Sequence, residues 1–463
     1  MLIRIVTFVV LVALSQENVL GQLTLSDCVK TVFNDHPIVQ LSELQVSKAE
    51  SYLLKARGNF DPKLEAEVNQ KEFADKNYYT LISGGLKIPT PVGLDIAAGY
   101  EVNRGLLLNP ENNLPAGGLM YGGIELSLGR GLWTDERRTQ KAQARVGLEL
   151  GVQQKNEILN NLVFDVIQQY LSYSRDNQIF ELYENASRNT LDRLNALRLQ
   201  VVAGDRPSID TVDASLQYQQ VEGLRLMAKW SAESSEILLE RTYLNQDSQN
   251  IDTLLAGPQK LDSLWISTRP LLTLNRQQLE SMHPLLSQYV RKQKQVELEI
   301  RFLRDRYKPD LRLQFFPLFE AASFNPSLFS VWENNKMGVQ FSMPIYFRKE
   351  RAEVQLAKIK WMVLESERVF KSNVIFAKYE TQALLWSNLN QQMTLVQSNL
   401  IQSRKLLDAE LRLWNNGESS LFLVNSREFA NIQINVRYVE LMYRNLMSYY
   451  SAHWNAGTLL NLF

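Results

Sequence analysis

Two carboxylates, Asp210 and Asp213, are the side chains of this sequence whose type and spacing first suggest chemistry. They lie three residues apart in a stretch with helical periodicity, so they share one helix face. Two acidic groups on one face can attract cations together. The other interpretation is that both are solvated acids on a helix surface, and the residues by themselves leave the two interpretations open.

The remaining composition excludes several function classes. The chain has one cysteine, Cys28, and three histidines, too few for a disulfide framework or a zinc cluster. It contains no nucleotide-binding loop, metal-ligand spacing or nucleophile motif, so we expect no enzyme, no cofactor and no metal site. Lys plus Arg and Asp plus Glu number 50 each, and this zero balance gives no reason to expect nucleic acid as a partner.

The N-terminus is typical of a secretory signal peptide, residues 1–21. An apolar run of ten residues from Ile5 follows a short basic segment, and ten residues are too few to cross a bilayer. Cleavage is expected after Ser15 or Gly21, and we favour Gly21. No later segment has 18 consecutive apolar residues, so the mature chain is expected to enter a membrane only as a β-barrel.

The chain contains two copies of one plan. Each copy places a His-Pro pair 26 residues before a later proline, and equivalent positions lie 247 residues apart: His36 and Pro62, then His283 and Pro309. Further on, Glu136 and Glu350 correspond at an offset of only 214, so the first copy has 33 extra residues before Glu136. We therefore expect two repeats, residues 22–270 and residues 271–463.

Within each repeat, the apolar pattern changes from helical to alternating and back. A helix is expected after each His-Pro pair, and strands with period-two alternation are expected near residues 63–69, 122–129, 310–315 and 337–343. A helix of 68 residues, Thr134–Val201, follows in the first repeat and would be about 100 Å long. Residues 80–102 fit either two more strands or a long surface loop.

These elements predict an assembly of several chains. Four membrane-compatible strands cannot close a barrel, because about eight are the minimum, and open strand edges are not tolerated in lipid. Several copies must then share one barrel, and the long helices would form a tube that continues from it. The sequence thus predicts a mainly α chain with a membrane β-barrel contribution, built from a duplicated unit of a strand pair and very long helices.

The order of these segments resembles the TolC-like outer-membrane efflux protein family. The resemblance rests on RGNFDP before a strand, GLWTDERRTQKAQA before the long helix and a glycine-centred turn, in a plan repeated twice. It implies a homotrimer with a 12-stranded barrel in the bacterial outer membrane and an α-helical barrel extending into the periplasm. The implied partners are other copies of the chain, outer-membrane lipid, a periplasmic membrane-fusion adaptor and an inner-membrane pump or transporter.

The resemblance also assigns roles to the two glycine-centred turns. They would lie at the periplasmic tip, where adaptors dock: Gly204, Asp205, Arg206, Gly417, Glu418 and Ser419. Each glycine suits the left-handed position that ends a helix. Family members often carry an acidic ring after this turn, which makes Asp210 and Asp213 a candidate pore constriction. Leu423 and Ser426 occupy the matching positions of the second repeat, so any charged gate is expected on the first hairpin alone.

The expected function is passive conduction of substrates out of the cell as the outer component of a tripartite export system. One alternative is the same role in polypeptide (type I) secretion, and another is a periplasmic coiled-coil scaffold without a pore. Aromatic residues near the strand ends favour interfacial girdles, although core packing would also explain them. They are Trp133, Phe315, Phe316, Phe319, Trp332, Tyr346 and Phe347.

Overall fold

The computed structural model describes residues 22–244, 257–267, 270–271, 273–320 and 330–463. The expected signal peptide, residues 1–21, lies outside this part of the chain. The described residues form two compact units, one within 22–43, 156–284 and 371–463, the other within 44–155 and 285–370. Each unit therefore combines segments of both sequence repeats. None of the described helices is both long and apolar enough to cross a membrane.

The order of the helices repeats, and three of the four helix pairs agree in length to within one residue. The helices after the His-Pro pairs both have 22 residues, the longest helices have 67 and 68, and the helices that follow them have 35 and 36. The first set is α2 (Leu25–Asp35), α3 (Pro37–Gly58), α4 (Glu136–Val202) and α5 (Ile209–Tyr243). The second set is α8 (Arg276–Met282), α9 (Pro284–Asp305), α11 (Arg348–Asn415) and α12 (Leu421–Ala456).

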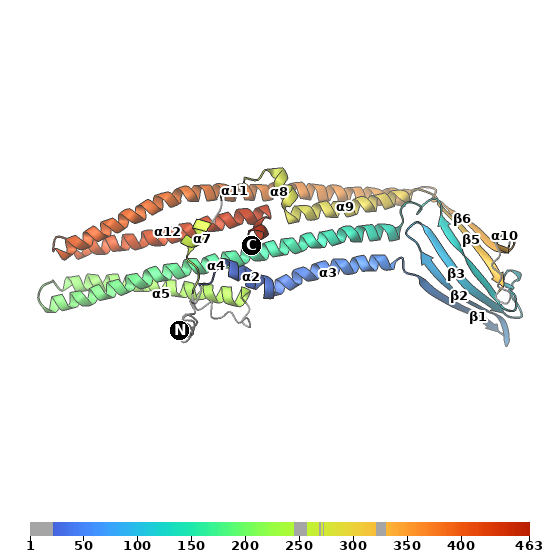
Figure 1. Ribbon diagram of the computed structural model, residues 1–463, viewed down its shortest axis with the longest axis horizontal. Coiled ribbons are helices and arrows are strands. Elements are labelled where there is room, and N and C mark those ends of the chain that lie inside the picture. The colour runs from blue at the N-terminus through green and yellow to red at the C-terminus, as the bar shows by residue number, and fades with distance from the viewer. Residues whose placement is uncertain (1–21, 245–256, 268–269, 272, 321–329) are drawn as a thin grey trace, which may run out of the picture. The chain divides into compact units, whose positions relative to one another are not determined.

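One curled antiparallel sheet of six strands, in chain order from β1 to β6, dominates the second unit (Figure 1). The strands are β1 (Lys63–Phe73), β2 (Lys76–Pro89), β3 (Leu94–Arg104), β4 (Leu119–Ser127), β5 (Asp310–Glu320) and β6 (Asn335–Ser342). The extra residues of the first repeat form β2 and β3, which decides in favour of strands over a loop. The chain thus supplies six strands where the resemblance implied four.

The turn between β2 and β3 explains why this hairpin forms. Gly93 has φ +81°, a left-handed conformation that costs glycine little. The backbone N–H and the hydroxyl of Thr90 both donate to the carbonyl oxygen of Leu94, which closes the turn. Short helices occupy the connections elsewhere: η1 (Pro110–Asn112), α7 (Leu261–Ser267), α10 (Ser330–Glu333) and η3 (Leu459–Leu462).

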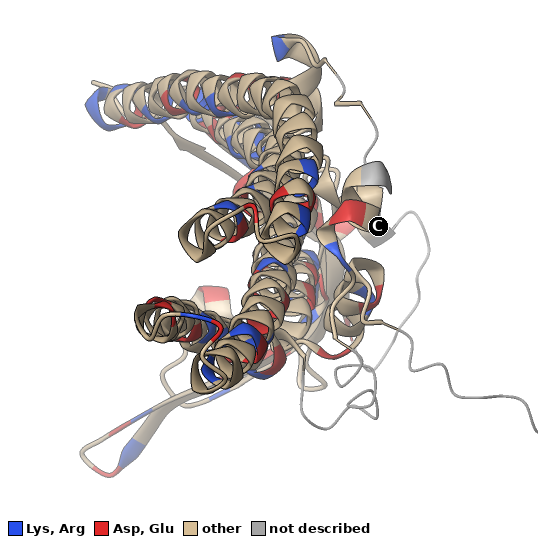
Figure 2. Cartoon of the chain, turned by 90° about the vertical axis from the view of Figure 1, so that its left-hand side faces the viewer, with Lys and Arg blue, Asp and Glu red and all other residues tan. Residues whose placement is uncertain are grey.

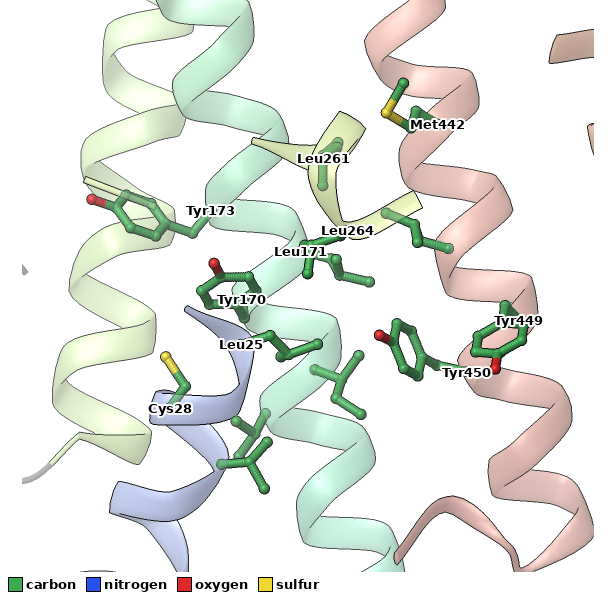
Figure 3. Packing of buried hydrophobic residues seen from close by; sticks show 14 of the residues in the cluster. Leu25, Cys28, Tyr170, Leu171, Tyr173, Leu261, Leu264, Met442, Tyr449 and Tyr450 are labelled. Atoms are coloured by element: carbon green, nitrogen blue, oxygen red, sulfur yellow. The ribbon is translucent and has the colours of Figure 1, made fainter. Parts of the chain in front are cut away.

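The first unit has its hydrophobic core where α2, α4, α5, α7 and α12 meet (Figure 3). Leu162, Val166 and Tyr170, which recur every four residues along α4, are all buried there. The hydroxyl of Tyr170 donates to the carbonyl oxygen of Leu23 at 2.6 Å. Cys28 is fully buried on α2, and burial raises the pKa of its thiol to about 12. A thiol in that state is a packing residue and not a nucleophile.

Candidate functional site

The six-stranded sheet has two chemically different faces, which the strand register defines. Leu64 pairs with Leu86, Leu86 with Ala98, and Ala98 with Gly122, so side chains of one kind line up across the sheet. We call the first face the apolar face; it contains Leu64, Ala66, Val68, Ile82, Leu86, Ile96, Ala98, Tyr100, Val102, Met120, Ile124, Leu126, Leu311, Leu313, Phe315, Phe319, Met337, Val339 and Phe341.

The opposite face, called here the polar face, alternates with it along every strand. It contains Lys63, Glu65, Glu67, Asn69, Ser83, Lys87, Asp95, Ala97, Glu101, Asn103, Tyr121, Glu125, Arg312, Gln314, Lys336 and Gln340, with Leu81, Leu119, Phe316 and Leu318 as apolar members. A hollow of about 890 Å³ is lined largely by these residues, so the polar face is the concave one. The apolar face is therefore convex.

The charges of the polar face are paired across strands. Lys87 Nζ donates to Glu125 Oε2 at 2.9 Å, and Gln314 Nε2 donates to Glu125 Oε1 at 2.9 Å. Arg137, in the first turn of α4, donates to Asp95 at 3.1 Å. These pairs join β2, β3, β4 and β5 on the concave side. The concave surface therefore carries charges of both signs, as expected of a surface in contact with water.

The apolar face lies open in the single chain. Leu64 is 84% exposed on β1, and Val339 and Phe341 are 62% and 64% exposed on β6. A large contiguous apolar surface on a single chain marks a site of contact with another protein or with a membrane. Alternating apolar-out and polar-in side chains are the pattern of a strand with lipid on one side and an aqueous lumen on the other.

Two aromatic side chains expected near the strand ends lie on the surface. Trp133 and Trp332 are 78% and 77% exposed, so core packing does not explain them. Tyr346 is 71% exposed, and its ring contacts the guanidinium of Arg348 at 5.3 Å. Phe315 and Phe319 belong to the apolar face, whereas Phe316 lies on the polar face, where its ring meets that of Tyr121 at 5.8 Å.

The first unit contains the second candidate region, the tips of the two helical hairpins. Gly204 has φ +83° and Gly417 has φ +82°, so the expected left-handed helix ends are confirmed. The N–H of Asp205 donates to the carbonyl of Gln200 at 3.0 Å, and the N–H of Glu418 donates to the carbonyl of Leu413 at 2.9 Å. Both tips thus use the same six-to-one closing bond, the Schellman arrangement.

The returning helices begin differently. Ser420 caps α12, because its hydroxyl accepts the N–H of Leu423 at 3.4 Å, whereas Ser208 makes no side-chain cap on α5. Ser419 donates to the carboxylate of Glu410. Across the two tips, the Arg206 guanidinium lies 4.2 Å from the centre of the Trp414 ring. This contact joins the two tips, and Asp205 and Glu418, each next to one of the two glycines, are exposed.

A buried polar network behind the tips was not predicted from the sequence. Arg193 on α4 donates to Glu428 at 2.6 Å and to Asn425 at 3.0 Å, both on α12. Asn425 in turn donates to Asp213 on α5 at 3.3 Å. Glu428 and Asn425 are buried. The sequence does contain one indication of this network. Asn425 and Glu428 lie three residues apart on the helix face that carries the apolar Leu421 and Val424, and polar groups that are buried on such a face require partners.

The structure thus places the candidate constriction residues in different surroundings. Asp213 contacts the second hairpin at Asn425, a position that the glycine alignment did not match to it. Asp210 is half-buried near the start of α5, and Leu423 and Ser426 are exposed on α12. Lysines, arginines and acidic residues are interspersed along the helices that reach both tips (Figure 2).

The histidines serve packing in the first unit. His36 stacks on Tyr243 with ring centres 5.9 Å apart. Burial lowers the pKa of His283 to about 4 and also lowers the pKa of His453, so both rings are neutral in the core. Among the described residues, no group of three or more His, Cys, Asp and Glu side chains could hold a metal ion.

Comparison with known proteins gives matches in structure but not in sequence. No protein-family model matches this chain, and no curated protein matches it. The open state of the Neisseria gonorrhoeae MtrE outer membrane channel matches with a TM-score of 0.69 at 13% identity, covering 94% of this chain and 89% of that chain.

Two further solved structures match over similar lengths. The Campylobacter jejuni CmeC outer membrane channel has a TM-score of 0.64 at 13% identity, covering 94% of this chain and 86% of that chain. The Vibrio cholerae outer membrane protein VceC has a TM-score of 0.62 at 12% identity, covering 94% and 96%. This chain therefore has the fold of the TolC-like outer-membrane efflux channels.

Proposed function

We propose that this protein is an outer-membrane channel that passively conducts substrates from the periplasm to the exterior. The observation that carries the proposal is the two-faced sheet, apolar and convex on one side, polar and concave on the other, across all six strands. Lipid would contact the apolar face and water the polar face. The exposed Trp133, Trp332 and Tyr346 would lie at the membrane interfaces.

The channel is proposed to be a homotrimer. Among the described strands, β1 pairs only with β2 and β6 only with β5, which leaves an edge at each side of the sheet. Unpaired backbone groups are too costly in hydrocarbon for such edges to face lipid. Pairing with further copies of the chain would remove them, and the family that the sequence resembles implies three copies.

The hairpin tips are proposed to dock a periplasmic adaptor and, through it, an inner-membrane pump. The docking surface would consist of Arg206 and Trp414 with the residues beside the two glycines, the exposed Asp205 and Glu418 and the half-buried Ser419. In a trimer, Asp210 and Asp213 would bring six carboxylates near the pore axis, while Leu423 and Ser426 contribute no charge. The gate would thus carry its charge on the first hairpin and attract cations.

The channel is tested by reconstituting the purified full-length protein into planar bilayers. The proposal expects discrete conductance steps and recovery of the protein from the outer-membrane fraction. A soluble monomer without conductance would instead identify a periplasmic scaffold and refute the channel. If polypeptides but not small molecules are exported in cells, the channel stands and its role is type I secretion.

The gate is tested separately with the Asp210→Asn/Asp213→Asn variant. Loss of cation preference at unchanged conductance steps is expected, because the substitutions remove charge and keep shape. The Ser426→Asn variant is the matched control on the second hairpin and should keep the wild-type preference. Unchanged selectivity of the double variant would show that these acids are solvated surface groups.

A further inference from the structure

We propose that all six strands of each chain cross the outer membrane, so that three chains close a barrel of 18 strands, in which β1 of one chain pairs with β6 of the next. This inference rests on the proposed function and its three-chain assembly. It departs from the twelve strands that the resemblance implied. The decisive element is the hairpin of β2 and β3, which comes from the extra residues of the first repeat.

This hairpin has the same two faces as the rest of the sheet. On β2, Ile82 belongs to the apolar face and pairs with Val68 and Val102, whereas Ser83 belongs to the polar face and pairs with Glu67 and Glu101. If the hairpin lay in water above the membrane, the apolar side chains on both of its strands would be exposed to water, which is unfavourable. The register therefore indicates that β2 and β3 share the lipid environment of β4 and β5.

The strands of the hairpin are also long enough to cross. β2 has 14 residues and β3 has 11, and a tilted transmembrane strand needs about 9–11 residues. Lys87 of β2 and Asp95 of β3 approach to 3.9 Å on the polar face. Their charges join the network of Glu125 and Arg137, so the hairpin is integrated on the concave side as well.

The two edges of the sheet fit each other as partners. Six strands in antiparallel succession leave β1 and β6 running in opposite directions, so joining them keeps the whole ring antiparallel. Every residue of β1 is exposed, as are most of β6. Both edge strands continue the same two faces, and the polar face carries Glu65 and Glu67 on β1 and Lys336 on β6. These features favour a second copy of this chain as the partner of each edge strand.

The strand number sets the width of the exit. With strands about 4.8 Å apart and tilted by about 40°, 18 strands give a backbone-to-backbone diameter of roughly 36 Å, against roughly 24 Å for twelve. After about 10 Å is subtracted for side chains, the wider ring would let a helix of about 10–12 Å diameter pass freely. Such a barrel would not exclude a single polypeptide helix by size.

Single-cysteine variants test the inference on the full-length protein in phospholipid vesicles. Ile82→Cys and Ser83→Cys are neighbours on opposite faces of β2, and Val339→Cys with Gln340→Cys forms the matched reference pair on β6. Each variant is treated exhaustively with a membrane-impermeant maleimide and with a lipid-soluble maleimide. Native Cys28 is buried and protonated, and Cys28→Ala removes any background.

Ser83→Cys and Gln340→Cys are expected to react with the impermeant reagent, and Ile82→Cys and Val339→Cys only with the lipid-soluble reagent. If both β2 variants react fully with the impermeant reagent while the β6 pair keeps its difference, the hairpin lies outside the barrel wall and the inference is overturned, but the channel stands. If the β6 pair also loses its difference, the proposed channel itself fails. Electron cryo-microscopy of the wild-type complex gives the strand count directly: 18 supports the inference and twelve refutes it.

Discussion

The two-faced sheet makes a sharp prediction at two neighbouring alanines of β3. Ala98 lies on the apolar face between Leu86 and Gly122, and Ala97 lies on the polar face between Lys87 and Gly123. Replacing each alanine with arginine adds the same charged side chain to adjacent positions of one strand. Only the solvent that surrounds the new side chain differs, so the pair isolates the contribution of lipid.

The expected magnitudes follow from the position of Ala98 in the strand. It is the fifth of the eleven residues of β3, which would place it near the middle of the membrane in the proposed barrel. Arginine on the lipid face of a barrel at the bilayer midplane costs about 2–4 kcal/mol. Ala98→Arg should therefore lower the folding equilibrium constant by roughly 30-fold to 700-fold for each chain. Ala97→Arg should cost less than about 1 kcal/mol, because its guanidinium can remain hydrated.

The free energy of unfolding is measured by urea titration of the protein folded into phospholipid vesicles, followed by tryptophan fluorescence and by the mobility of unheated samples in gels. Ala98→Leu is the control for size and should leave the urea midpoint near the wild-type value. Equal losses of stability for Ala97→Arg and Ala98→Arg would show that neither face contacts lipid. A larger loss for Ala97→Arg would invert the assignment of the faces.

Three further predictions concern the first unit. Gly204→Ala should destabilise the protein by about 1–2 kcal/mol, because the left-handed backbone is unfavourable for alanine even though no described atom lies within 4 Å of the new methyl group. Gly223→Ala inside α5 should instead stabilise the protein by about 0.5–1 kcal/mol. The denaturant midpoint should fall for the first variant and rise for the second. Arg193→Met should cost roughly 3 kcal/mol by leaving Glu428 buried without its cation, and adding Glu428→Met should recover most of that loss, as a double-mutant cycle would measure. Burial lowers the pKa of His283 to about 4, so its contribution to stability should be complete above about pH 6.5 and should disappear as the pH falls towards 4. His283→Gln should flatten this part of the plot of unfolding free energy against pH. An unchanged plot would contradict the conclusion that protonation of the buried His283 destabilises the fold.

Sequence patterns were sufficient for features that depend on neighbouring residues. The long helix predicted at Thr134–Val201 is α4, Glu136–Val202, because an uninterrupted helical pattern ends where glycine permits a left-handed turn. The same reasoning placed Gly204 and Gly417 correctly at the helix ends. In each case the decisive physics, backbone sterics and helical periodicity, acts within a few residues.

Features that depend on distant residues were not predictable in the same way. Residues 80–102 alternate as strands do, but only pairing with β1 and β4 shows that they belong to the sheet. Arg193 and Glu428 are 235 positions apart, so no local pattern connects them. A polar residue on a helix can be recognised as unusual from its sequence, whereas its partner depends on which helices pack together.

The network behind the tips restricts how a gate in this protein could open. Arg193 belongs to α4, Asp213 to α5, and Asn425 and Glu428 to α12, and their side chains form one continuous chain of hydrogen bonds. Sliding α12 against α4 would separate Glu428 from Arg193 while both remain poorly hydrated, and breaking such a pair costs several kcal/mol. The two hairpin tips of one chain should therefore move as a single body near this network. In the proposed trimer, opening would therefore occur at contacts between chains. Val202 and Phe422, which are 88% and 72% exposed in the single chain, are candidates for such contacts.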